Sequence, residues 1–105
     1  MMDLETENGG PIALANFDEV RNALFDLDEK RDGFVIVKDG ERMIQTAFDG
    51  DRLVVEKSEG PQDPLYRASR DGSQKLPLSE IEAVFRSWYD RAPMPLGIQW
   101  LETEE

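Results

Sequence analysis

The chain has 105 residues, of which 23 are acidic and 12 basic, with a formal net charge of −11 and neither histidine nor cysteine. Histidine and cysteine are the usual general base, nucleophile and zinc ligands, so the commonest catalytic and zinc sites are excluded, as is any disulfide. The negative charge disfavours direct binding to nucleic acid or an anionic membrane and favours cationic partners, although solubility alone is the plainer explanation.

The first ten residues, MMDLETENGG, predict a disordered tail over 1–10, because they are polar and end in two glycines. They lack the apolar core of a secretory signal, and the apolar run 34–37 is far too short to span a bilayer. Residues 11–105 predict a single domain, which we expect to be cytoplasmic. Within it, residues 11–15 predict a short edge strand.

An amphipathic helix is predicted from Asn16 to the Asp32-Gly33 pair. Asn16 and Glu19 have the spacing of a capping box, and apolar residues then recur at helical intervals. Asp-Gly pairs at 32–33, 39–40, 49–50 and 71–72 are strong signals of tight turns.

Strand-length runs lie between these pairs, at 34–38, 42–48 and 52–57, and they predict an antiparallel meander. The first run, FVIVK, predicts a strand buried on both faces. A fourth strand is predicted over 65–69, after a loop rich in proline and acids.

A second helix is predicted to begin at Ser79, with Glu82 completing a capping box and prolines 93 and 95 ending it. Its apolar face comprises Ile81, Val84, Phe85, Trp88 and Tyr89, a set that we interpret as core. Residues 96–101 predict a last strand, followed by an acidic tail over 102–105. The predicted fold is α+β, a single antiparallel sheet of four to five strands with two helices packed on one face.

No motif predicts catalysis. Asp28-x-Lys30-x-Asp32-Gly33 imitates a calcium loop, but Lys30 occupies a ligand position and a strand follows the glycine. The serines have no histidine to activate them, and no phosphate-binding loop is present. We therefore predict no catalytic residue, no metal ligand and no cofactor.

Four segments resemble the deaminase-toxin-associated immunity family of bacterial polymorphic toxin systems, together covering about residues 16–101. They are a helix followed by Phe34–Val37, the strand Met43–Ala47, the strand end Val54–Glu56 with the later Tyr66-Arg67, and the helix Ile81–Tyr89 leading to Ile98–Trp100. The resemblance implies a protein that binds a cognate toxin domain, often a nucleic-acid deaminase, in the producer's cytoplasm and blocks its active site. Gln45, Glu56 and Trp100 are compatible with structural roles and with partner contacts alike.

The leading hypothesis is thus a non-enzymatic, monomeric immunity protein whose acids take the place of phosphates in the basic active-site cleft of a toxin. The predicted partner-binding residues are Asp49, Asp51, Glu56, Glu59, Asp63 and Tyr66.

Two alternatives stay open. One is another acidic interaction module, such as a nucleic-acid-mimicking inhibitor or a secretion chaperone, although six basic side chains interleave with eight acids over residues 33–74 and weaken the case for mimicry. The other is an enzyme that uses carboxylates and a metal, which requires acids clustered in a concave site.

Overall fold

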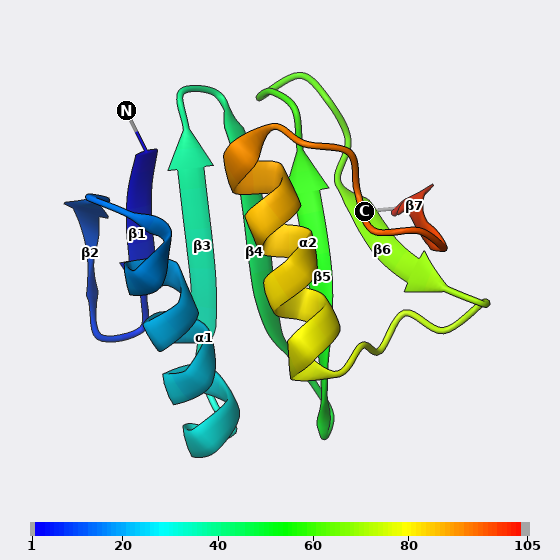
Figure 1. Cartoon of the computed structure of the whole chain (residues 1–105), viewed down its shortest axis with the longest axis horizontal. Coiled ribbons are helices and arrows are strands. Elements are labelled where there is room, and N and C mark those ends of the chain that lie inside the picture. The colour runs from blue at the N-terminus through cyan, green and yellow to red at the C-terminus, as the bar shows by residue number, and fades with distance from the viewer. Residues whose placement is uncertain (1, 104–105) are drawn as a thin grey trace.

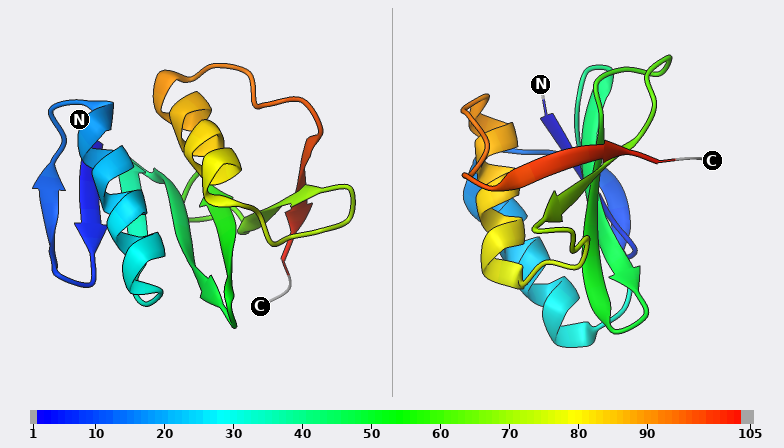
Figure 2. Two further views of the ribbon diagram at one scale, coloured as in Figure 1. Left: turned by 60° about the horizontal axis from the view of Figure 1, so that its bottom comes forward. Right: turned by 90° about the vertical axis from the view of Figure 1, so that its right-hand side faces the viewer.

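A computed structural model describes residues 2–103, and it places two helices on one face of a seven-stranded antiparallel sheet (Figures 1 and 2). The strand order across the sheet is β2-β1-β3-β4-β5-β6-β7. In chain order the elements are β1 (Met2–Thr6), β2 (Gly9–Ala13), α1 (Phe17–Lys30), β3 (Phe34–Asp39), β4 (Arg42–Asp49), β5 (Arg52–Ser58), β6 (Tyr66–Arg70), α2 (Leu78–Asp90) and β7 (Ile98–Glu102).

The predicted class and the predicted meander β3-β4-β5 are confirmed, but the sheet has seven strands where four to five were expected. The N-terminal segment accounts for much of the difference. Residues 2–6 and 9–13 form β1 and β2, so the prediction of a disordered tail over 1–10 is wrong for its described part. Of the acidic tail predicted over 102–105, residue 102 ends β7, and residues 104 and 105 lie outside the described residues, as does residue 1.

The stability of β1 comes from its neighbours rather than from its own sequence. It pairs with β3 over its whole length, with Leu4 opposite Val37, and both of these side chains are buried. Leu4 is the only fully buried residue of the strand, so the local apolar signal is weak. β2 forms the edge, where Pro11 can be accommodated although it lacks an N–H group.

Helix α1 begins where the capping residue Asn16 predicts. The Asn16 side chain accepts a hydrogen bond from the Asp18 N–H at 3.0 Å. The Glu19 carboxylate accepts from the Ala15 N–H at 2.6 Å, one residue before the donor of a standard capping box. The helix ends at Lys30, with Arg31 in the left-handed region at φ 58°.

A glycine is required in the turn between α1 and β3. Gly33 has φ +104°, and a Cβ atom there would overlap the Glu7 carboxylate. That carboxylate accepts a hydrogen bond from the Phe34 N–H at 3.2 Å. The contact ties the β1–β2 turn to the start of β3, next to the end of α1.

Helix α2 begins one residue earlier than predicted. Pro77 is its N-cap, with φ −70° and ψ 157°, and no side chain caps this end. Ser79 therefore lies inside the first turn, and its predicted capping role is wrong. The carbonyl of Pro77 accepts from the N–H groups of Glu80 and Ile81, so the backbone enters the helix at the proline. The predicted apolar face is confirmed for Ile81, Val84, Phe85 and Trp88, which are buried, while Tyr89 packs edge-on against Phe17 of α1.

A cluster around Asp39 holds the C-terminal end of α2 against the turn between β3 and β4. The Asp39 carboxylate accepts hydrogen bonds from Arg42 at 3.2 Å and from Arg91 at 2.9 Å. The Arg42 guanidinium lies 4.0 Å from the centre of the Trp88 ring. Partial burial alone would raise the pKa of Asp39, but the hydrogen bonds and charges of Arg42 and Arg91 outweigh it and hold that pKa below its ordinary value.

The cap assignment predicts that two alanine substitutions differ in their effect on the free energy of unfolding. Asn16→Ala should lower the free energy of unfolding by about 1 kcal/mol, because it removes the side-chain cap of α1. Ser79→Ala should change it by less than about 0.5 kcal/mol, since Ser79 is exposed and caps nothing. Chemical denaturation of both variants measures the difference. Equal losses would contradict the assignment.

Replacing Asp39 should make stability less dependent on pH. Asp39→Asn should lower the free energy of unfolding by about 1–2 kcal/mol at pH 7, because two guanidinium groups lose their carboxylate. Because the folded pKa is below the ordinary value of 3.8, this contribution is complete above that value and is lost as the pH falls through the folded pKa.

The gap between wild type and Asp39→Asn should therefore close during an acid titration of unfolding free energies. Asp71→Asn, in an exposed turn, is the matched control and should show no such gap. A gap that persists at the acid limit would show that the charge of Asp39 is not what stabilises the fold.

Candidate functional site

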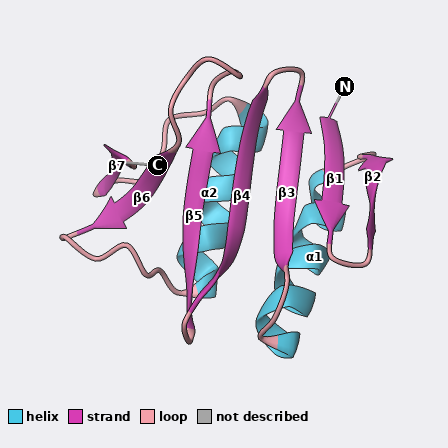
Figure 3. Ribbon diagram, turned by 180° about the vertical axis from the view of Figure 1, so that it is seen from behind, coloured by secondary structure: helices cyan, strands magenta, loops and turns pink. Residues whose placement is uncertain are grey.

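One face of the sheet carries no helix, and we call it the open face (Figure 3). Along β3, Val35 and Val37 are buried toward the helices, whereas Phe34 and Ile36 point to the opposite side and are only partly buried. The prediction that this strand is buried on both faces is therefore wrong. A sheet with one solvated face usually alternates apolar and polar residues, so apolar side chains on the open face call for an explanation.

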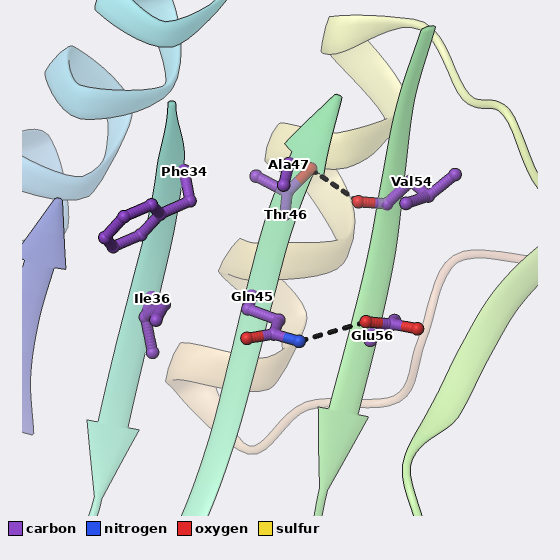
Figure 4. A pocket seen from close by; sticks show the side chains of 7 residues that line it. All are labelled: Phe34, Ile36, Gln45, Thr46, Ala47, Val54 and Glu56. Carbon is purple, nitrogen blue, oxygen red and sulfur yellow. Dashed lines mark hydrogen bonds between the residues drawn. The ribbon is translucent and has the colours of Figure 1, made fainter. Parts of the chain in front are cut away.

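Three apolar residues lie in register across the open face. Phe34 of β3 is opposite Ala47 of β4, which is opposite Val54 of β5, and we call these three residues the apolar row. Phe34 and Ala47 are partly buried, and Val54 is 7% exposed although no helix covers it. The small side chain of Ala47 lies between two larger ones, and a shallow hollow of about 270 Å³ opens there (Figure 4).

A second row beside the apolar row is mostly polar and internally hydrogen-bonded. Ile36, Gln45, Glu56 and Arg67 are in register across β3, β4, β5 and β6. The Gln45 amide nitrogen donates to Glu56 Oε1 at 3.0 Å, and Arg67 Nη2 donates to Glu56 Oε2 at 2.8 Å. Arg67 Nη1 also donates to the Gln74 side chain at 3.3 Å. We call the hydrogen-bonded set Gln45, Glu56, Arg67 and Gln74 the polar row.

The polar row changes the role that can be assigned to Glu56. Its side chain is only 14% exposed, and both carboxylate oxygens accept hydrogen bonds from neighbouring strands. A carboxylate that is already paired with a guanidinium offers little free charge to a partner. Glu56 therefore shapes and orders the open face rather than acting as a free acid.

Four of the other predicted partner-binding residues lie at the two ends of β5. Asp49 and Asp51 are exposed at the turn between β4 and β5, where the Asp51 carbonyl accepts a hydrogen bond from Arg31 at 2.6 Å. Glu59 and Asp63 are exposed in the loop that follows β5, where Glu59 forms an ion pair with Lys57 at 3.3 Å.

The structure does not bring the two groups of acids together. The seven residues of β5 separate them, and a strand of that length spans about 20 Å. Tyr66, the remaining predicted residue, begins β6 opposite Lys57 and is partly buried on the helix-covered face. The predicted site is thus two acidic ends with the open face between them.

Three residues noted in the family resemblance lie on different faces of the sheet. Gln45 and Glu56 are hydrogen-bonded partners on the open face. Trp100 lies opposite Ala68, on the side of the helices, where it packs against the core. The Lys57 ammonium is 4.7 Å from the centre of the Trp100 ring.

Reasoning from sequence missed the apolar row and Arg67. The available signal was the run 34–37, in which all four residues are apolar, including those that point to opposite faces of the strand. The predicted fold has helices on one face only. Alternate apolar residues of this run therefore had to lie on the uncovered face.

Two further properties of the described chain bear on the site. Within residues 2–103, no three carboxylates converge as a metal-ion site requires. Neither described helix has the length and apolar character needed to cross a bilayer.

In comparisons with known proteins, the chain matches no model of a protein family, no curated protein and no solved structure. The resemblance to the immunity family therefore stays a prediction.

The hydrogen bonding of Glu56 predicts a structural cost for its removal. Glu56→Ala should lower the free energy of unfolding by about 1–2 kcal/mol, because Gln45 and Arg67 lose their shared acceptor. Asp49→Ala, an exposed acid on the neighbouring strand, should change it by less than about 0.5 kcal/mol. Urea denaturation of the two variants provides the comparison, and an equal effect would show that the polar row contributes no stability.

Proposed function

We propose that this protein is an immunity-type inhibitor that binds a cognate toxin domain and occludes its active site. The observation that carries the proposal is the open face, which places a partly exposed apolar row beside an ordered polar row on a rigid sheet. Specific protein interfaces combine an apolar centre with polar groups of this kind.

The charge of the chain supports a cationic partner. The formal net charge is −11, and exposed acids lie at both ends of β5. A toxin that acts on nucleic acid needs basic side chains to hold phosphates, so its active-site cleft is positively charged. An acidic inhibitor is then attracted over a distance, and its association is accelerated. We propose a deaminase-type toxin, in agreement with the resemblance of the four segments.

The proposed mechanism is steric. The inhibitor covers the cleft while both proteins are in the cytoplasm of the producing cell, and no covalent bond is made or broken. It acts as a monomer without a cofactor. Mimicry of a phosphate chain is less well supported, because Glu56 and Glu59 are already paired with Arg67 and Lys57.

The direct test uses the protein encoded next to this gene. Expression of that neighbour alone should arrest the growth of a bacterial host, and co-expression with this chain should restore growth. The two proteins should then co-purify at a fixed ratio. A harmless neighbour, or growth arrest that persists on co-expression, would overturn the proposal.

The exposed acids should govern the speed of association. The triple variant Asp49→Ala, Asp51→Ala, Asp63→Ala removes three exposed carboxylates at the two ends of β5. Its association rate constant with the toxin should fall severalfold at low salt and depend less on ionic strength, because long-range attraction is reduced.

The dissociation rate constant of the same variant should change little, since rim charges act mainly on encounter. Stopped-flow or surface-based kinetics at several salt concentrations separates the two constants. An unchanged association rate constant would show that these acids do not lie at the binding surface.

A further inference from the structure

We infer that the partner docks on the open face by placing one apolar side chain over Ala47, with a lysine or arginine beside it. This inference rests on the proposed function and deepens it, because it names the docking surface and the chemistry of the partner's contact. The acids at the ends of β5 then form the rim, and the apolar row forms the centre.

The first argument concerns Ala47 itself. Strand propensity accounts for a β-branched residue such as Val54 on the open face, but alanine is depleted in strands. Ala47 nevertheless lies in the middle of the sheet, between Phe34 and Val54, and leaves the hollow of about 270 Å³. The hollow is shallow, and its volume lies just below the range that encloses small ligands, so it fits a protein side chain better.

The second argument concerns the polar wall of the hollow. The Glu56 carboxylate can only accept hydrogen bonds, so the Gln45 amide must turn its nitrogen toward it. The Gln45 amide oxygen then points the other way, toward Ile36 (Figure 4), and accepts no hydrogen bond from a described residue. These side chains are already ordered, so binding costs little further conformational entropy.

The third argument identifies the charge of the group beside the apolar contact. Glu5 of β1 is opposite Ile36, so Ile36 lies between the Glu5 carboxylate and the Gln45 amide oxygen. Among the described residues, Glu5 and its neighbour on the same face, Asp3, form no ion pair. A lysine or arginine of the partner, placed next to the partner's apolar side chain, satisfies both the Glu5 carboxylate and the Gln45 amide oxygen.

A second copy of this chain is the rival occupant, and charge argues against it. Two copies would bring together chains of net charge −11 each, with the unpaired acids of β1 gathered in the same interface. Like charges placed together cost free energy, whereas a basic partner gains from the same acids.

The decisive experiment fills the hollow and uses the neighbouring gene's product as the probe. Ala47→Leu occupies the space over the apolar row without entering the helix-covered core. Ala83→Leu is the matched control, because Ala83 is an exposed residue of α2, on the layer of the molecule opposite the open face. Thermal unfolding of both variants verifies that they remain folded.

Titration calorimetry should show that Ala47→Leu raises the dissociation constant about tenfold or more, as changes to central contacts do, and that Ala83→Leu leaves it within about twofold. Equal affinity of Ala47→Leu and wild type would overturn the docking inference while leaving the proposed function intact. If the wild type itself does not bind the probe, the proposed function fails and this inference fails with it.

Two further measurements test the charge and the rival occupant. The double variant Asp3→Asn, Glu5→Gln should weaken binding and reduce its salt dependence, and an unchanged salt dependence would refute the cationic contact. Analytical ultracentrifugation of the wild type alone should show a monomer. A dimer that Ala47→Leu dissociates would assign the open face to self-association and overturn the inference.

Discussion

Two short helices have to cover a seven-stranded sheet, and they can cover only one of its faces. α1 and α2 run roughly along the strands (Figure 1), and each is about 10 Å in diameter, so the pair covers about 20 Å of a sheet that six interstrand spacings make about 29 Å wide. The helices lie side by side on the same layer (Figure 2). Every strand beneath them therefore divides its alternate residues between a buried core and the open face.

This division determines which residues are available for recognition. The helix-facing set holds the fold together through Val35, Val37 and their neighbours, while Phe34 and Ile36 contribute to the open face. Ion pairs also help to hold the fold together. Asp39 joins the β3–β4 turn to the end of α2, and Glu80 of α2 pairs with Arg70 of β6, so these acids join separate elements of the fold. Among the described residues, the side chains of the exposed turn acids Asp49, Asp51 and Asp71 form no such ion pair, and these acids contribute mainly to the field around the molecule.

Several elements could be predicted from the sequence because their signals are local. Asn16 supplies its own cap, the apolar face of α2 repeats at helical spacing, and the Asp-Gly pairs at 39–40 and 49–50 separate runs of strand length. Ser79 failed as a cap because Pro77 turns the backbone into the helix first. β1 could not be predicted, since its one buried residue carries little pattern and its hydrogen bonds come from β3.

By itself, the sequence determined the class of the fold, the three strands of the meander and the excess of negative charge, because each depends on spacing along the chain or on composition. Only the tertiary structure decided which residues meet. Glu56 gains Arg67 and Gln45 across strand pairs, and Phe34, Ala47 and Val54 become one row. Strand register and the placement of the helices produce these neighbours, and both are set by packing between segments distant in the chain.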